Sequence, residues 1–153
     1  MTRLIIVDAD GSFRSSLCDL ACAAEDTEVV AETGDVRESL NLLAAPHSSV
    51  LFFGVERLQG EHLSFLRQVV RVAPKTRIIL AARSADDRLV VDAFRIGLWG
   101  FVKKSAESIP EIMRAIRTVG RGGSFLTPHL TALVLDEFVR VSTRARPVSQ
   151  AGK

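Results

Sequence analysis

The residues best suited to do chemistry are charged side chains that follow apolar segments. Asp8 and Asp10 follow the first apolar segment of the chain, and Lys104 follows a later one. Carboxylates are ligands for Mg²⁺, and a lysine ammonium is a point charge that binds phosphate oxygens. The most apolar segment, Val50–Phe53, is followed by Gly54 instead of an acidic residue. Because glycine has no side chain, position 54 cannot supply a nucleophile or accept a phosphoryl group.

Five short segments alternate with helical patterns, and they must position these residues. The segments predict strands at Leu4–Val7, Glu28–Ala31, Val50–Phe53, Arg77–Ala81 and Phe101-Val102. Alternation of strands and helices implies a parallel sheet with helices on both faces. The functional crevice of such a sheet lies at the carboxyl ends of its strands. That rule selects a candidate site made of Asp8, Gly54, Ala82 and Lys104.

Helix boundaries follow from a few local signals. Ser12 is the expected cap of the first helix, and Asp10 is an alternative because a helix N-terminus favours an anion. Pro46 ends the second helix, since proline interrupts helical hydrogen bonding. Asp86 or Asp87 opens the fourth helix.

A further helix is predicted beyond the five-stranded unit. Thr127-Pro128 is a helix start, with threonine as the cap and proline at the first helical position. One face of this helix carries the apolar residues Leu130, Leu133, Val134, Phe138 and Val141. A face of this size must be buried against the domain or against another chain. From Ser142 onward the composition is that of a linker or a disordered end.

Length and composition describe an ordinary globular chain. The 153 residues fit one domain, with 47% hydrophobic and 25% charged residues. The formal net charge of +2 is too small to argue for nucleic-acid binding by itself. No apolar run is long enough to span a membrane, and the apolar start stops at Asp8 without a secretion signal. We therefore expect a cytoplasmic protein without membrane association.

The two cysteines, Cys18 and Cys22, are four residues apart within one helical pattern. Residues at this spacing share a helix face. A metal site would need two or more further ligands, whereas His47, His62 and His129 are scattered along the chain. We therefore expect two small buried residues, and no disulfide in a reducing compartment.

Three stretches of the chain together form a specific pattern. They are Ile5-Ile6-Val7-Asp8, the segment from Arg95-Ile96-Gly97 to Val102-Lys103-Lys104, and the segment from Ile112-Met113-Arg114 to Gly122-Gly123. In these stretches, residues 3–121 resemble the receiver domain of bacterial two-component response regulators, in its NarL/LuxR-type form. The resemblance implies a flavodoxin-like α/β fold, a doubly wound five-stranded parallel sheet of order 2-1-3-4-5, here with an extra C-terminal helix.

The resemblance also implies a division of the chain. A receiver-like domain is expected at 1–121, a linker and the extra helix at 122–141, and a flexible tail at 142–153. In the family, such a tail leads to a DNA-binding helix-turn-helix, which is not present in this chain.

The resemblance assigns roles to the candidate site. The positions of the family's phosphorylation pocket carry Asp8, Ala9, Gly54, Ala82 and Lys104, with Phe101 as the switch aromatic. Asp8 matches the first of two acidic residues that hold Mg²⁺, and Lys104 matches the family lysine. Alanine replaces the second acidic residue, glycine the phosphoacceptor and alanine the switch hydroxyl. Because Mg²⁺ binding and phosphoryl transfer need those groups, we predict a pocket closed by a Lys–Asp contact, without phosphorylation.

Other polar residues offer alternatives at the same site. Asp10 either replaces the missing metal carboxylate or caps the helix, so Asp8 and Asp10 are the candidates if a metal is bound. Glu56 is an alternative phosphoacceptor or phosphate mimic, although we expect its side chain to project differently from the strand tip. Ser84 lies near the missing hydroxyl, and Lys104 either binds an anion or forms a structural ion pair. No cofactor is expected.

Two classes of function remain. The first is a regulatory and dimerisation receiver of a transcriptional regulator, free of phosphorylation control, which binds DNA through the missing domain. The second is a small-molecule sensor whose vacated pocket binds a ligand. An enzyme is not expected, because no phosphate-cradling glycine-rich loop and no nucleophile–base pair is found. The candidate homodimer surfaces are the Asp87–Val119 face, with Trp99 near its centre in a glycine-flanked loop, the first and fifth helices, and the final apolar stripe.

Overall fold

The computed structural model describes residues 1–44 and 48–145, with the backbone alone for 144 and 145. The centre of the domain is a sheet of strands β1 (Thr2–Asp8), β2 (Thr27–Thr33), β3 (Val50–Arg57), β4 (Arg77–Ser84) and β5 (Leu98–Lys103). The strands lie in the order β2-β1-β3-β4-β5, and every neighbouring pair is parallel. This architecture confirms the predicted doubly wound α/β fold and its strand order.

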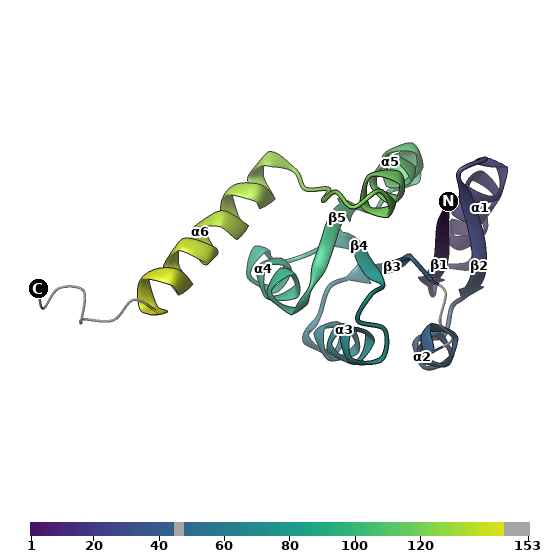
Figure 1. Ribbon diagram of the computed structural model, residues 1–153. Helices are drawn as coiled ribbons and strands as arrows, with labels where there is room; N and C mark the ends of the chain where they lie inside the picture. Colours follow the sequence, from purple (N-terminus) through teal and green to yellow (C-terminus); the bar gives the residue numbers. More distant parts are fainter. Residues whose placement is uncertain (45–47, 146–153) are drawn as a thin grey trace, which may run out of the picture.

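Helices cover both faces of the sheet (Figure 1). They are α1 (Gly11–Ala23), α2 (Val36–Ala44), α3 (Gly60–Val72), α4 (Asp87–Ile96), α5 (Ile109–Gly120) and α6 (Pro128–Ala145), with a short 3₁₀ turn, η1 (Ala106–Ser108), before α5. Figure 1 shows α1 and α5 on one face and α2, α3 and α4 on the other. This arrangement follows from parallel pairing, because each strand must be carried back across a face before the next begins.

Two apolar clusters fill the space between the sheet and its helices. On the α1–α5 side, Phe13 stacks on Phe52 with ring centres 6.3 Å apart. On the opposite side, Phe53 packs against Phe65 with ring centres 4.7 Å apart. Successive side chains of a strand point to opposite faces, so β3 contributes to both clusters. Burial on both faces explains why this strand is a continuous apolar run at the centre of the sheet.

The strands extend further at their carboxyl ends than the apolar runs predicted. β3 continues through Gly54 to Arg57, so the interpretation of Gly54 as the end of the strand is wrong. Gly54 lies opposite Asp8 of β1 and Ala81 of β4 in the sheet register. Past Gly54, backbone pairing with β4 alone continues β3 even where its side chains become charged. Glu56 is therefore still a strand residue.

Asp10 caps α1, whereas Ser12 lies inside the helix, so the prediction of Ser12 as the cap is wrong. Asp10 Oδ1 accepts hydrogen bonds of 3.1 Å from the backbone N–H of Ser12 and of the next residue. A carboxylate also interacts favourably with the helix dipole, which a hydroxyl does not. Asp86 caps α4 in the same way and accepts from the N–H of Arg88 at 2.8 Å. The predicted end of α2 at Pro46 falls outside the described residues.

The predicted final helix is present as α6, and it extends past Val141 to Ala145. The part of the expected tail from 142 to 145 is thus helical, and 146–153 lie outside the described residues. The segment before α6 is tethered to β5, because Phe125 exchanges backbone hydrogen bonds of 3.0 Å with Trp99 and Phe101. From there α6 runs past α4 and away from the sheet (Figure 1). No described helix is both long and apolar enough to cross a membrane.

The cysteines of α1 are not the buried residues that were expected. Cys18 is half-buried and Cys22 is exposed, while Leu17 and Ala21 occupy the buried face of the helix. One residue along a helix rotates the side chain by about 100° around the axis. Each cysteine follows a buried residue by one position, so the pair lies at the margin of the buried face.

Candidate functional site

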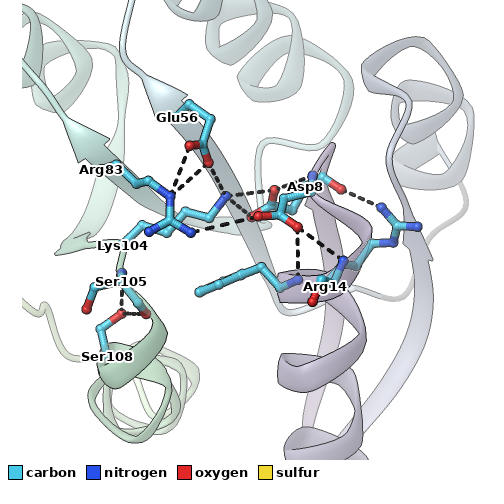
Figure 2. A network of polar contacts seen from close by, with 10 residues as sticks. Asp8, Arg14, Glu56, Arg83, Lys104, Ser105 and Ser108 are labelled. Carbon is cyan, nitrogen blue, oxygen red and sulfur yellow. Dashed lines mark hydrogen bonds and ion pairs between the residues drawn. The ribbon is translucent and has the colours of Figure 1, made fainter.

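Asp8 and Lys104 form a buried ion pair at the carboxyl end of the sheet (Figure 2). Lys104 Nζ donates a hydrogen bond of 2.9 Å to Asp8 Oδ1 and lies 2.9 Å from Oδ2. Only 2% of Asp8 and 1% of Lys104 is exposed. A charge removed from water to this extent needs a partner of opposite sign, because its desolvation is otherwise uncompensated. Each residue therefore supplies the counter-ion of the other.

Backbone contacts fix the position of Lys104. Its N–H donates to the Ala82 carbonyl at 2.8 Å, which continues the pairing of β4 with β5. Ser108 Oγ then accepts from the Ser105 N–H at 2.9 Å and donates to the Ser105 carbonyl at 2.8 Å, so the chain turns directly after the lysine (Figure 2). The ammonium also lies 4.7 Å from the centre of the Phe13 ring, which adds a cation–π interaction.

Gly54 leaves the space that the Asp8 carboxylate occupies. A Cβ atom at position 54 would collide with Asp8 Oδ2 and would lie 2.9 Å from Asp8 Cγ and 3.0 Å from Phe52 Cε2. Asp8 Oδ2 is buried and accepts no hydrogen bond, although the Lys104 ammonium lies 2.9 Å away. A side chain at position 54 and the present Asp8 conformation are therefore mutually exclusive.

Glu56 closes the outer side of the ion pair. Its Oε2 lies 3.1 Å from Lys104 Nζ and 3.1 Å from Arg83 Nε, which both donate to it. Because β3 continues past Gly54, residues 54 and 56 point to the same face of the strand. The expectation that Glu56 projects differently is thus wrong. The hydrogen bond from Lys104, supported by Arg83, holds the pKa of the Glu56 carboxyl below its usual range.

Arg83 and Asp10 complete the network around the pair, and Figure 2 shows Arg83 beside Lys104 and Glu56. Arg83 Nη2 lies 3.8 Å from Asp10 Oδ2, so the guanidinium bridges Asp10 and Glu56. The pKa of Asp10 is lowered, foremost by the hydrogen bond from the Phe13 N–H and also by the charges of Lys104 and Arg83. Sequence reasoning missed Arg83, because β4 was expected to end at Ala81. The signal that was available is a cation within two residues of that expected end.

Arg14 supports the site from α1. Its Nη1 donates to the backbone carbonyl of Asp8 at 2.6 Å, and its Nε pairs with Glu32 of the edge strand β2. The Asp8 backbone is thus held by an arginine on one side and paired in the sheet with Gly54 on the other. Arg14 was also missed from sequence, since nothing in its spacing distinguishes it from a solvated helix residue.

The oxygen donors at this site do not fit Mg²⁺. Octahedral coordination of this ion uses carboxylate oxygens that are free to face it. Asp8 and Glu56 are bound to Lys104, Asp10 caps α1 and approaches Arg83, and Ala9 contributes no ligand. A divalent cation placed here would also lie against two fixed positive charges. Within residues 1–44 and 48–145, no cluster of three or more His, Cys, Asp or Glu side chains suits a metal ion.

Ala82 and Phe101 occupy the expected hydroxyl and aromatic positions. Both pack in the apolar cluster on the opposite face of the sheet from Phe13, which contacts Lys104. Ala82 is buried, and Ser84 is exposed at the end of the strand, where its carbonyl accepts from the Leu58 N–H at 3.0 Å. Phe101 is half-buried beside a cavity of about 500 Å³ that Ala82 and Leu130 also line. Phe101 therefore lies next to the start of α6.

The candidate interface residues fall into two groups. Trp99 lies within β5 instead of the expected loop, and its ring stacks under Arg77, whose guanidinium carbon is 4.7 Å from the ring centre. In α6, Leu130 is buried, and Leu133 and Val134 are half-buried near α4. Phe138, one turn further on, is 67% exposed. The apolar stripe of α6 is therefore only half covered by its own domain.

Curated proteins similar to this chain are bacterial regulators. The DNA-binding transcriptional activator DevR/DosR of Mycobacterium tuberculosis is 26% identical over 149 residues, which are 97% of this chain and 68% of that protein. The oxygen regulatory protein NreC of Staphylococcus carnosus is 25% identical over 138 residues, which are 90% of this chain and 63% of that protein. The homologues of this chain are response regulators of the NarL/LuxR type. No family model matches the chain.

Solved receiver domains of response regulators share the fold of this chain. A LuxR-family two-component response regulator from Aurantimonas superimposes with a TM-score of 0.75 at 23% identity, covering 91% of this chain and 99% of that one. The isolated REC domain of RcsB from Salmonella enterica gives a TM-score of 0.77 at 18% identity, covering 88% and 98%. The chain spans 68% and 63% of the length of DevR/DosR and NreC, respectively.

Proposed function

We propose that this chain is the regulatory receiver of a transcriptional response regulator that works without phosphorylation. The observation that carries the proposal is the Asp8 carboxylate, which Lys104 holds directly over Gly54. In a phosphorylated receiver, this space must admit an acceptor side chain, a phosphoryl group and a metal ion. Here a buried internal ion pair fills it, and position 54 has no nucleophile.

The charge balance around the ion pair also supports a receiver that works without phosphorylation. Phosphoryl transfer needs an attacking group in line with the donor and cations that balance charge on the equatorial oxygens. Lys104 and Arg83 are the cations of this site, and both are already neutralised by Asp8, Asp10 and Glu56. Glu56 thus occupies the cations that an incoming phosphoryl group would need. Regulation, and not catalysis, is what this arrangement serves.

The output of the proposed regulator lies in its C-terminal part. We assign residues 1–121 to the receiver, 122–141 to the linker and most of α6, and 142–153 to a connection toward a DNA-binding domain. The proposed partners are a second copy of the chain, through the exposed apolar face of α6, and DNA, through that further domain. Support comes from the relatives, among them a DNA-binding transcriptional activator, and from the two-fold symmetry that paired half-sites impose on such readers.

The small-molecule alternative has less support at the predicted pocket. The cavity beside Asp8 and Gly54 has a volume of about 160 Å³. Ligand pockets usually measure about 300–1,000 Å³. The ion pair fills the space that an absent acceptor side chain was expected to vacate. Native mass spectrometry of protein purified from its own host would reveal a retained ligand as added mass and would then favour the sensor.

Phosphodonor treatment tests the main proposal. Incubation with acetyl phosphate, or with beryllofluoride, and Mg²⁺ should leave the intact mass and the Trp99 fluorescence unchanged. Gly54→Asp alone should also remain unmodified, because Ala9 and Ala82 still lack a carboxylate and a hydroxyl. The variant Ala9→Asp/Gly54→Asp/Ala82→Thr restores all three positions and serves as the positive control. A stable phosphoryl group on the unaltered chain, at Glu56 or Asp10, would overturn the proposal.

A further inference from the structure

Another cavity at the carboxyl ends of the strands lies between β4, β5, α4 and the start of α6. Its volume is about 500 Å³, whereas the cavity beside Asp8 and Gly54 has about 160 Å³. Ligand pockets usually measure about 300–1,000 Å³. In sheets of this kind, ligands bind outside the carboxyl ends of the strands. This cavity therefore has the size and the place of a ligand site.

The two strands present four side chains to the cavity. β4 contributes Ala82 and Ser84, and β5 contributes Phe101 and Lys103. Alternate residues of a strand point to the same face, and Ala82 lies opposite Lys103 in the sheet register. The four side chains thus share the face of the sheet that α4 covers, next to the buried ion pair but separate from it.

The inner part of the cavity is apolar. Ala82, together with Val90 of α4 and Leu130 of α6, is almost completely buried, and Phe101 is half-buried beside them. The small side chain of Ala82 leaves space next to the Phe101 ring. A ligand that fills this space must have an apolar body, because the buried walls offer it no charged partner.

The exposed charges of the cavity favour a negative group. Lys103 is exposed and forms no ion pair within the described part of the chain. Asp87 is the acidic residue among the described lining residues, and its Oδ2 lies 3.1 Å from His129 Nε2. Arg83 also lines the cavity, but it is already bound to the carboxylates of the candidate site. Lys103 is therefore the cation that can receive an anion.

We propose that this cavity binds a small organic anion, in which an apolar body such as an aromatic ring carries a carboxylate, sulfonate or phosphate group. The apolar body lies against Phe101 and Leu130, and the negative group pairs with Lys103. The charge of the cavity and its apolar interior together select this class of ligand over a neutral or a fully polar molecule.

A ligand in this cavity contacts both the strands and the final helix. Leu130 of α6 packs in the apolar cluster of this face, and the His129–Asp87 hydrogen bond ties the start of α6 to α4. A ligand shifts a conformational equilibrium only when it binds one state better than the other, and contacts on both sides provide that difference. Control of α6 by the ligand rests on the proposed receiver function, whereas binding itself does not.

Anilinonaphthalene sulfonate, an aromatic sulfonate that fluoresces when it binds apolar surface, tests the site. The full chain should bind one molecule of this dye saturably. Lys103→Met should weaken binding at least tenfold, because a hydrogen bond between charged groups is lost. The matched control is Lys75→Met, since Lys75 is also exposed but precedes the amino end of β4, at the opposite edge of the sheet. It should leave the affinity unchanged.

Phenylnaphthylamine has the same aromatic body without the sulfonate, so it separates charge from apolar contact. The preference of the chain for the anionic dye over the neutral one should fall at least tenfold in Lys103→Met and stay unchanged in Lys75→Met. Equal preferences in these two variants would overturn the proposal, as would a lack of saturable binding to the unaltered chain.

Phe138→Ser locates the bound dye. Phe138 lies on the exposed part of α6 and does not line this cavity, so the variant should bind the dye as the unaltered chain does. Loss of binding in Phe138→Ser would place the dye on the outer face of α6 and would overturn the proposal. None of these results bears on phosphorylation, which is tested separately at Gly54.

Discussion

The Asp8–Lys104 pair and the outer face of α6 reverse the usual distribution of polar and apolar groups. The pair is charged and almost completely buried. On α6, Leu135, Phe138 and Val139 are apolar, yet each is more than half exposed. Buried charges are rare unless they are paired, and large exposed apolar patches usually mark an interaction surface. Both exceptions therefore require an explanation from function or from assembly.

The two regions differ in whether their exceptional side chains find partners within the chain. Lys104 forms ion pairs with Asp8 and Glu56, and Arg83 forms one with Glu56. An incoming anion therefore finds no unpaired cation in this network. The outer face of α6 has no such internal partner among the described residues. The comparison teaches that the charges of the buried pair are balanced within the chain, while the outer face of α6 is the surface on which another molecule can act.

The largest expected effect is the loss of the buried cation. Lys104→Met leaves the Asp8 carboxylate buried without a counter-ion, which should lower the free energy of unfolding by about 3–5 kcal/mol. Lys103→Met is the matched control, because Lys103 is the adjacent lysine and is exposed. It should change stability by less than about 0.5 kcal/mol. Urea denaturation measures both variants, and equal effects would show that the pair does not stabilise the core.

Gly54→Ala should have the next largest effect. The added Cβ collides with Asp8 Oδ2 and presses on Phe52, so the carboxylate must leave its place beside Lys104. Overpacking of this kind costs about 1–3 kcal/mol of folding free energy. Gly60→Ala provides the control, since a Cβ there meets nothing within 4 Å. If both alanines leave the urea midpoint unchanged, the Asp8 carboxylate moves freely and the closed pocket is not fixed by Gly54.

The outer face of α6 should control self-association. Phe138→Ser removes the most exposed of the large apolar side chains of the helix, and it should raise the dissociation constant of the proposed dimer at least tenfold. Folding of each chain should be little affected, because Phe138 is mostly outside the core. Asp136→Ser, on the polar side of the same helix, should leave association unchanged. Sedimentation at micromolar concentration decides the matter, and a monomer throughout would refute dimerisation through α6.

The Asp8–Lys104 contact and the presence of α6 were predictable from the sequence, because both depend on the pattern of apolar residues. Asp8 and Lys104 both follow apolar strands, and parallel strands bring their carboxyl ends together, so their contact could be inferred. The helical period beyond Thr127 likewise predicted α6. The extension of β3 past Gly54 could not be inferred in this way, because it depends on backbone pairing with β4, which continues although the side chains become charged.

Contacts made by long side chains were harder to predict from the sequence. Arg83 reaches both Glu56 and Asp10 only because β4 is longer than its apolar run. The exposure of Cys22 was in principle visible, since Leu17 and Ala21 define the buried face and the cysteines are offset from it by one residue. How much of α6 its own domain covers depends on the path of the helix past α4, which no local pattern encodes.

The smallest expected effect is a pH-dependent contribution of Glu56. Lys104, foremost, and Arg83 lower the pKa of its carboxyl from the ordinary value of 4.5. A lowered pKa in the folded state means that the carboxylate stabilises the fold above pH 4.5, and that this contribution is lost as the pH falls through the lowered value. Glu56→Gln should therefore be less stable than the unaltered chain at neutral pH, and the difference should shrink in acid.

Urea denaturation between neutral pH and pH 3 follows this difference. In the Arg83→Gln background the effect of Glu56→Gln should be smaller but still present, because the hydrogen bond from Lys104 remains. Since the Glu56 side chain is 64% exposed, solvent screening keeps the whole effect small. A stability difference that grows as the pH falls would mean that the carboxylate opposes folding. Glu56 would then be a strained neighbour of the ion pair and not the group that neutralises its outer side.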